Sequence, residues 1–212
     1  MTNGIGLFNP SNSEFSLKND LASGSADDVF DFGWPNTFTA FSGNFNQNEI
    51  TGVGIYNQSN GNFYLDNDNS AGKADEEFNF GPAGNDWIPI AGNFGGEVPT
   101  DSVALYDQSS GTFFIDNDLS GGKADTKVSF GPDGNDWTPF AGDFNGDGST
   151  GVGLYDQETG TFYLDSDNSG GLADKTFSFD PEGEDLSPLA GSWTKEKPAT
   201  GETFTLTVGA DN

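Results

Sequence analysis

One pattern occurs four times along the chain, and this repetition limits the possible folds more than any other feature. The hexapeptides GIGLFN, GVGIYN, SVALYD and GVGLYD begin at residues 4, 52, 102 and 151, so they lie 48, 50 and 49 residues apart. The tetrapeptides SGNF, AGNF, AGDF and AGSW recur in the same phase and end at residues 45, 94, 144 and 193. Units of about 50 residues are typical of β-propeller blades and are too long for most solenoid coils.

Within each copy, apolar side chains alternate with period two in four short runs, which indicates half-buried strands and not helices. We therefore predict an all-β protein, a four-bladed β-propeller of four-stranded antiparallel blades. The alternative is an open or partial propeller that a second chain completes. The first run of each copy has a small residue at its centre, and these residues are Gly6, Gly54, Ala104 and Gly153. Because small residues let another backbone approach closely, we expect this run to be the innermost strand of its blade.

The 212 residues are interpreted as a single repeat domain, with repeats at about 4–51, 52–101, 102–150 and 151–199. Residues 200–212 follow as an extra C-terminal strand, in which Phe204, Leu206 and Val208 alternate with polar residues. Three places for this strand stay open. It could overlap the N-terminal strand where the ring closes, lie on an outer edge, or add to the free strand edge of a neighbouring chain.

The composition excludes several classes of function. The chain has 34 Asp and Glu against 7 basic residues, all of them Lys, and a net charge of -27, so nucleic acid and anionic membranes are poor partners. It lacks His and Cys, which removes the usual general base and the usual nucleophile pairs. No segment has the length needed for membrane insertion. The first 15 residues lack the features of a signal peptide, so we expect an intracellular protein or a chain that begins after a removed segment.

The hairpin GVGLYDQETGTFYL and the corner AGDFNGDGSTG resemble the FG-GAP/VCBS-type, integrin-α-like propeller repeats of many bacterial surface and secreted proteins. The resemblance covers residues 4–193 and includes all four copies. It implies a propeller fold, which in such proteins serves adhesins, lectins and enzyme appendages alike. Relatives with closed rings commonly have more than four blades, so completion by a second chain stays open.

The resemblance also implies a calcium loop at the corner between successive blades, where alternate oxygen-bearing side chains converge on the ion. In the third copy the ligands would be Asp143, Asn145, Asp147 and Ser149. In the second copy they would be Asn93, Glu97 and Asp101. Calcium in a structural role is thus the expected cofactor. The alternative is a metal-free turn in which the Asp and Asn side chains bond the local backbone.

A second acidic loop recurs as LDNDNSAGKAD (65–75), IDNDLSGGKAD (115–125) and LDSDNSGGLAD (164–174), and in weaker form as LKNDLASGSAD (17–27). Two aspartates alternate at its start, as in Asp66 and Asp68. One interpretation is a solvated loop with Asx turns, which Asp and Asn favour without any ligand. The other is a cation or polyol site that is repeated around one face of the ring.

Trp87 and Trp137 occupy the same position in two repeats, where the other copies have Phe38 and Leu186. Beside acidic loops, such an indole could form the platform of a sugar site. Packing between blades is the alternative that we favour, because Leu replaces Trp within the chain itself. In a glycan site, the tryptophans would be joined by hydroxyl acceptors, namely Asp116, Asp118, Asp165 and Asp167.

Carboxylates are the remaining plausible catalytic groups, but they recur with the blades and no copy carries a unique constellation. We therefore predict a protein that is not an enzyme. The expected function is a calcium-associated recognition module, with glycan as the first choice of ligand and another protein surface as the second. The alternative is a structural or adhesive protein that assembles through its propeller edges and the C-terminal strand, with a homo-oligomer as a possible form.

Overall fold

The computed structural model describes residues 5–19, 23–46, 48, 50–95, 100–178 and 187–191. In these residues every regular element is a β-strand, and the strands form four antiparallel sheets. The first sheet contains β1 (Ile5–Asn9), β2 (Glu14–Lys18) and β3 (Asp28–Asp31). The second contains β4 (Thr39–Gly43), β5 (Gly52–Asn57), β6 (Asn62–Asp66) and β7 (Glu76–Asn79). The third contains β8 (Ile88–Gly92), β9 (Ser102–Asp107), β10 (Thr112–Asp116) and β11 (Thr126–Ser129). The fourth contains β12 (Thr138–Gly142), β13 (Gly151–Asp156), β14 (Thr161–Asp165) and β15 (Lys175–Ser178).

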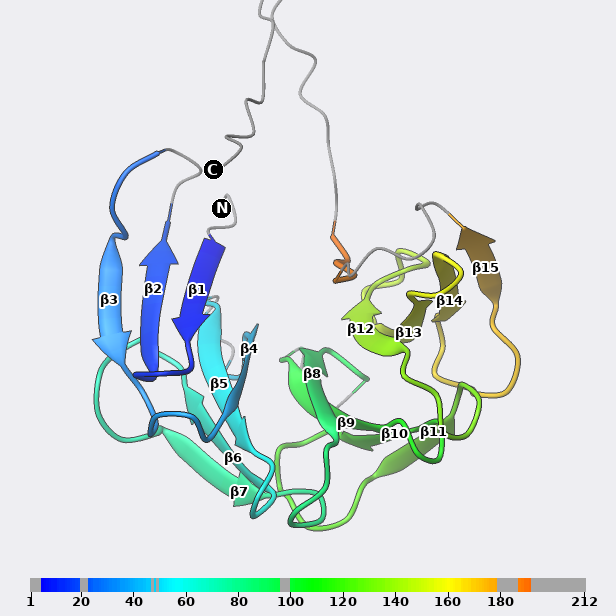
Figure 1. The fold of residues 1–212 in the computed structure, drawn as a ribbon, viewed down its shortest axis with the longest axis horizontal. Helices are drawn as coiled ribbons and strands as arrows, with labels where there is room; N and C mark the ends of the chain where they lie inside the picture. The colour runs from blue at the N-terminus through cyan, green and yellow to red at the C-terminus, as the bar shows by residue number, and fades with distance from the viewer. Residues whose placement is uncertain are drawn as a thin grey trace, which may run out of the picture.

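Each sheet is a blade in which consecutive strands are hydrogen-bonded neighbours. Figure 1 shows the blades arranged about a common centre, with β4, β8 and β12 nearest to it and β7, β11 and β15 on the outside. The prediction of an all-β, four-bladed β-propeller is thus confirmed. Within the described residues the first blade has three strands, β1 to β3. The expected strand at 200–212 lies outside the described part of the chain.

The prediction for the innermost strand is wrong. The run around Gly54 forms β5, the second strand of its blade, and the innermost strand is β4, which the sequence analysis placed at the end of the preceding repeat. The inner strands lie next to one another, since β4 contacts β8 and β8 contacts β12. A blade in space therefore joins the last strand of one sequence repeat to the first three strands of the next.

The small residues in the second strands are explained by the inner-strand side chains that lie over them. Phe41 of β4 is paired with Gly54, and a Cβ atom on Gly54 would overlap the Phe41 ring. Phe140 covers Gly153 in the same way. In the third blade the inner residue is the smaller Ile90, and its partner is Ala104. The size of the second-strand residue thus follows the size of the inner side chain that lies over it.

The hydrophobic core lies between successive blades. One side of each blade presents the residues of its second strand to the blade before it, as Val53 and Ile55 of β5 pack against Phe15 and Phe30. In the same manner, Val103 and Leu105 of β9 pack on the second blade. Val152 and Leu154 of β13 pack on the third blade. Burying one such side chain stabilises the fold by about 1.5–3 kcal/mol. Blade-to-blade packing therefore holds the molecule together.

The antiparallel meander decides which loops share an end of the blades. The corner loops after β4, β8 and β12 lie at the same end as the acidic loops after β6, β10 and β14, because strands one and three of a blade run in the same direction. We call this end the acidic end. The β5–β6, β9–β10 and β13–β14 hairpins lie at the opposite end. The described part of the chain contains no helix with the length and apolarity needed to cross a membrane.

Candidate cation sites at the acidic end

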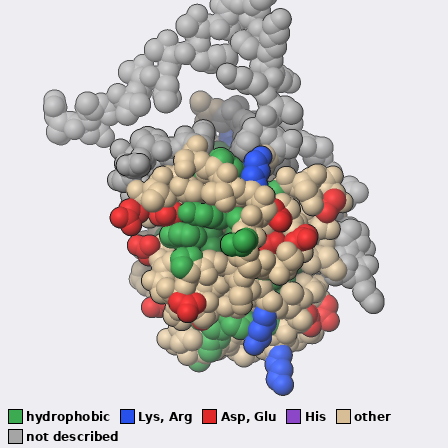
Figure 2. Space-filling model, turned by 90° about the vertical axis from the view of Figure 1, so that its right-hand side faces the viewer, with side chains coloured by type: hydrophobic (Ala, Val, Ile, Leu, Met, Phe, Trp, Pro, Cys, Tyr) green, Lys and Arg blue, Asp and Glu red, His purple; other side chains and the backbone are tan. Residues whose placement is uncertain are grey.

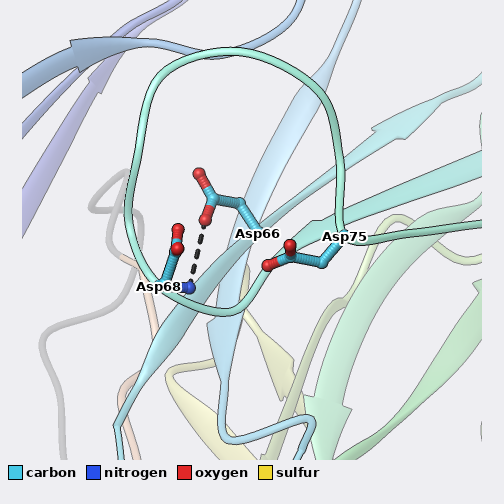
Figure 3. A group of neighbouring side chains, drawn as sticks. All are labelled: Asp66, Asp68 and Asp75. Atoms are coloured by element: carbon cyan, nitrogen blue, oxygen red, sulfur yellow. Dashed lines mark hydrogen bonds between the residues drawn. The ribbon is translucent and has the colours of Figure 1, made fainter.

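Three equivalent groups of carboxylates lie at the acidic end, one in each of the second, third and fourth blades. In each group the carboxylate oxygen atoms of three aspartates come within 4.8 Å of one another. The groups, called the acidic triads, are Asp66, Asp68 and Asp75; Asp116, Asp118 and Asp125; and Asp165, Asp167 and Asp174. Figure 3 shows the first triad, in which the side chains of Asp66 and Asp68 lie within the loop and that of Asp75 approaches from its end.

The loop that carries each triad is closed by its third aspartate. In the second blade, the Asp75 N–H donates to the Leu65 carbonyl at 2.8 Å, and Oδ2 of Asp75 accepts from the N–H of Asn67 at 2.8 Å. Between these contacts, Asn69 adopts the left-handed conformation with φ of 58°, which Asn tolerates better than most residues. The same two hydrogen bonds recur at Asp125 and Asp174. The local sequence therefore fixes the third carboxylate beside the first two.

The first two aspartates of each triad have opposite environments. The first, at Asp66, Asp116 and Asp165, has an exposed fraction of 1%, 0% and 1%. Desolvation by burial raises the pKa of each of these three carboxyls. The second aspartate is exposed, and a hydrogen bond from the following serine side chain lowers its pKa, as Ser120 does for Asp118. Each triad thus combines a buried carboxylate, for which the described residues show no ion-pair partner, with a readily ionised one.

One buried oxygen of the first triad has no hydrogen-bond partner among the described residues. Oδ1 of Asp66 accepts from the N–H groups of Asp68 and Ser70, but Oδ2 is buried and unpaired. In the other two triads this oxygen accepts from the N–H of Gly121 or Gly170, at 2.8 and 2.7 Å. A buried unpaired acceptor is costly, by about 1–3 kcal/mol, unless a ligand satisfies it.

The first blade has the same two closing hydrogen bonds but a different charge at the first position of the loop. The Asp27 N–H donates to the Leu17 carbonyl, and Oδ2 of Asp27 accepts from the N–H of Asn19, as in the other blades. At the position of the buried first aspartate, however, this copy has Lys18, whose Nζ lies 3.2 Å from Oδ1 of Asp27. The copy that lacks the first carboxylate therefore supplies a positive charge to the third one.

In the corner loop after β12, where the resemblance implies calcium, side-chain oxygen atoms accept hydrogen bonds from the backbone N–H groups of the same loop. Oδ1 of Asp143 accepts from the N–H of Gly146 and Oδ2 accepts from that of Gly148. Asp147 accepts from the Ser149 N–H and from the Asn145 side chain, and these hydrogen bonds lower its pKa. All the predicted ligands of this loop thus lie in one turn. A calcium loop and a metal-free turn would both require this arrangement.

The predicted ligands of the preceding corner link neighbouring blades. Oδ2 of Asp101, just before β9, accepts from the N–H of Asn44 in the second blade. Asn93 contacts the next blade in turn, because its N–H donates to Oγ1 of Thr150 and its side chain donates to the carbonyl of Gly148. Glu97 lies outside the described residues. Asn93 and Asp101 therefore have a visible role in fixing one blade to the next.

Trp87 and Trp137 pack against the hydrophobic core between blades. Trp87 stacks on Phe114 and Trp137 on Tyr163, each with ring centroids 4.5 Å apart, and both indoles contact the inter-blade core. Both tryptophans precede an inner strand, whereas Asp116 ends the third strand of its blade. From the strand register, Asp116 is four residues, or about 13 Å, from the level of Trp87. Each tryptophan therefore packs on an aromatic ring, Phe114 or Tyr163, that lies two residues before the first aspartate of its blade, and the combined site of Trp87, Trp137, Asp116, Asp118, Asp165 and Asp167 stays a prediction.

The third aspartate of each triad was missed as a site residue in the sequence analysis. Asp75, Asp125 and Asp174 lie nine residues after the first aspartate, outside the alternating pattern that revealed the pairs. A signal was present, because the dipeptide Ala-Asp ends the loop in all four copies. This dipeptide marks a site residue only because the loop turns back on itself. The spacing alone does not indicate such a turn.

No protein-family model matches the chain, and no curated protein matches it. Among solved structures, the crystal structure of BBS1N in complex with ARL6DN, soaked with lead, is similar over 84% of this chain and 53% of that chain, at 9% sequence identity and a TM-score of 0.49. This chain thus spans about half the length of that one. Such a distant likeness has no bearing on ligand or function, and the FG-GAP/VCBS resemblance stays a prediction.

Proposed function

We propose that the protein is a non-enzymatic binding module that holds a calcium ion in each of its three acidic triads. The observation that carries this proposal is that the first blade has Lys18 where the other three blades have the buried aspartate. Where the buried aspartate is present, three carboxylates converge with no ion pair to a lysine among the described residues, and where Lys18 replaces it, the ammonium group lies beside Asp27. The two hydrogen bonds that close the loop are the same in all four blades, so the position favours a cation of either kind.

The chemistry of the triads favours calcium among the common divalent cations. All the candidate ligand atoms are oxygens, and calcium binds carboxylate, amide and carbonyl oxygens in flexible geometry. The unpaired Oδ2 of Asp66 and the nearby buried amide oxygens of Asn67 and Asn69 add acceptors without hydrogen-bond partners in the described residues. Zinc would be a poorer choice, because the chain offers neither His nor Cys.

The open side of each triad supports a role in recognition. Two of its three aspartates are exposed, so a bound calcium ion would keep coordination positions that face the solvent. A ligand with closely spaced oxygen atoms could occupy those positions, and the hydroxyl pairs of a glycan have this chemistry. We therefore keep glycan as the proposed ligand class, bound through calcium at the acidic end. Trp87 and Trp137 are assigned to blade packing instead.

The substitution Asp116→Asn tests the cation sites. We expect calcium titration of the EDTA-treated protein by calorimetry to give one fewer ion per chain, because one triad loses its buried carboxylate. Asp133→Asn is the matched control, since it removes the same charge from an exposed loop at the opposite end. An unchanged calcium count for Asp116→Asn, in a variant that folds normally, would contradict the assignment.

Glycan binding is tested separately, on an array probed in calcium and in EDTA. The proposal expects binding that requires calcium and that Asp116→Asn weakens while Asp133→Asn does not. Binding that persists in EDTA would exclude a calcium-bridged ligand. Calcium uptake without any glycan binding would leave the cation sites in place and remove the glycan from the proposal.

A further inference from the structure

The two ends of the blade series expose side chains whose counterparts in the other blades are buried or half-buried. In the second to fourth blades, the residues of the second strand that face the preceding blade are almost inaccessible, for example Val53 at 4% and Ile55 at 1%. The equivalent residues of the first blade, Ile5 and Leu7, are 61% and 74% exposed. The first blade thus presents an uncovered face of the kind that packs against another blade.

The last blade exposes the complementary face. Phe177 of β15 is 39% exposed, whereas Phe30 and Val128, at the same position in the first and third blades, are 8% and 1% exposed because the following blade covers them. Figure 2 views the molecule from the side of β15 and shows a group of hydrophobic side chains with acidic side chains around it. The last blade therefore presents the surface on which a next blade normally packs.

The first blade also has room for an inner strand. Among the described strands, β1 is paired on one side only, with β2. A groove of ≈ 670 Å³ runs along β1 towards β4, and Gly6, Leu17 and Phe41 are among the residues that line it. In the other blades this position is filled by the inner strand, which contacts the inner strand of the next blade as β4 contacts β8.

A segment with the sequence of an inner strand lies at the other end of the chain. Residues 187–191, SPLAG, repeat the pattern of TPFAG in β12 and IPIAG in β8. They form no strand in the structure, and Leu189 is 76% exposed. Ala190 lies against the end of β12, because a Cβ atom added to Gly142 would come within 2.6 Å of its Cβ. The segment is thus held beside the last blade, away from β1 (Figure 1).

We propose that two copies of this chain join head to tail, each inserting residues 187–191 along β1 of the other copy as the inner strand of its first blade. The register follows from the three complete blades. Phe41, Ile90 and Phe140 lie opposite Gly54, Ala104 and Gly153, so Leu189 lies opposite Gly6. By the same rule, Ala190 lies opposite Ile5. Leu189 then covers a glycine, as the large inner residues do in the second and fourth blades.

A second copy fits better than the chain's own first blade. The segment and β1 lie at opposite ends of the blade series, and the segment is in contact with β12. In a two-fold symmetric pair, the exposed face of each last blade covers the exposed face of the partner's first blade, and both contacts are satisfied at once. This inference does not depend on calcium binding, because none of the triad residues takes part in it.

Engineered cysteines test the pairing, since the chain has none of its own. Directly opposed residues of antiparallel strands have Cα atoms about 4.5–5.5 Å apart, which a disulfide can bridge. Chains that carry only Ile5→Cys are mixed with chains that carry only Ala190→Cys and are then oxidised. We expect a disulfide-linked dimer of twice the chain mass of 22.4 kDa, and only trace dimer from either variant alone. Ile5→Cys mixed with Leu172→Cys, an exposed position outside the proposed contact, is the control.

The double variant, Ile5→Cys with Ala190→Cys, distinguishes the two sources of the strand. A dimer on a non-reducing gel supports exchange between copies. A disulfide confined to single chains would show that the chain closes on itself and would overturn the second copy as the occupant. No selective disulfide in either experiment would overturn the strand pairing. The mass of the unsubstituted protein in solution, measured by light scattering, gives an independent check, because the proposal requires a twofold mass at high concentration.

Discussion

At the scale of single residues, the buried aspartate of each triad carries the functional proposal. Asp116 is fully buried, and it lies beside Asp118, with which it shares the loop. A buried carboxylate without a compensating charge destabilises the folded state unless it is protonated or binds a cation. The alternation of aspartates predicted the first two residues of the site from sequence. The burial of the first depends on the loop folding over it, as the N–H groups of Ser120 and Gly121 do at Asp116, and a local pattern cannot reveal this fold.

The pH dependence follows from the raised pKa of Asp66, Asp116 and Asp165. Because the folded-state pKa lies above its ordinary value of 3.8, these groups favour the folded state at low pH, and this contribution is lost as the pH rises through the raised pKa. Calcium competes with the proton for the same oxygen atoms. We therefore expect the increase in Tm caused by calcium to be small in acid and to grow towards neutral pH.

The measurement is a series of thermal unfolding curves, with calcium and with EDTA, from pH near 3.8 to neutral. The triple variant Asp66→Asn, Asp116→Asn, Asp165→Asn should show little calcium effect at any pH in the series. A calcium effect that is the same in acid and at neutral pH would mean that these carboxyls are not the ligands.

At the scale of elements, the sequence predicted the strands but not their grouping into blades. Period two is a property of one strand, so it located the runs around Gly54, Ala104 and Gly153 without showing which strand lies beside them. The pairing of large and small residues across β4–β5, β8–β9 and β12–β13 contains that information. It is visible only when two positions of the repeat are compared with each other.

The pair Phe140 and Gly153 tests this relation through a double-mutant cycle. Gly153→Ala alone should destabilise the protein by about 1–3 kcal/mol, because the new methyl group would overlap the Phe140 ring. Phe140→Ile alone should also be destabilising, since it leaves a cavity over Gly153. The double variant reproduces the Ile90 and Ala104 pair of the third blade, so its loss of stability should be smaller than the sum of the two.

Urea unfolding of the four proteins gives the interaction energy, which we expect to be about 0.5–3 kcal/mol in favour of the double variant. Additive single effects would contradict the relation between inner side chain and second-strand residue. The register of residues 187–191 on β1 would then lose its basis as well, because it assumes the same relation for Leu189 and Gly6.

At the scale of the whole molecule, repetition makes the fold predictable, but it does not predict the exposed faces of the first and last blades. Four copies in phase indicate four blades, and the structure confirms them. The sequence could not show that the faces of the first and last blades stay exposed, because Ile5 and Leu7 match the buried residues of the other copies in type. Exposure at these positions depends on what lies beyond the repeat, which no property of the repeat itself specifies.

Bound calcium would also act on the charge of the whole molecule. The three triads lie at one end of the blades, together with the corner loops, and the chain carries a net charge of -27. Like charges at this density repel each other in the folded state, and bound divalent cations relieve that repulsion. Calcium should therefore stabilise the molecule as a whole as well as the individual loops.

The central claim is that the three acidic triads bind calcium, and the most direct test is to count the ions. Calorimetric titration of EDTA-treated protein gives the number of ions per chain, and the triple variant Asp66→Asn, Asp116→Asn, Asp165→Asn is titrated beside it. The account predicts three ions that the triple variant loses. A protein that takes up no calcium, or one whose uptake is unchanged in the triple variant, would contradict it.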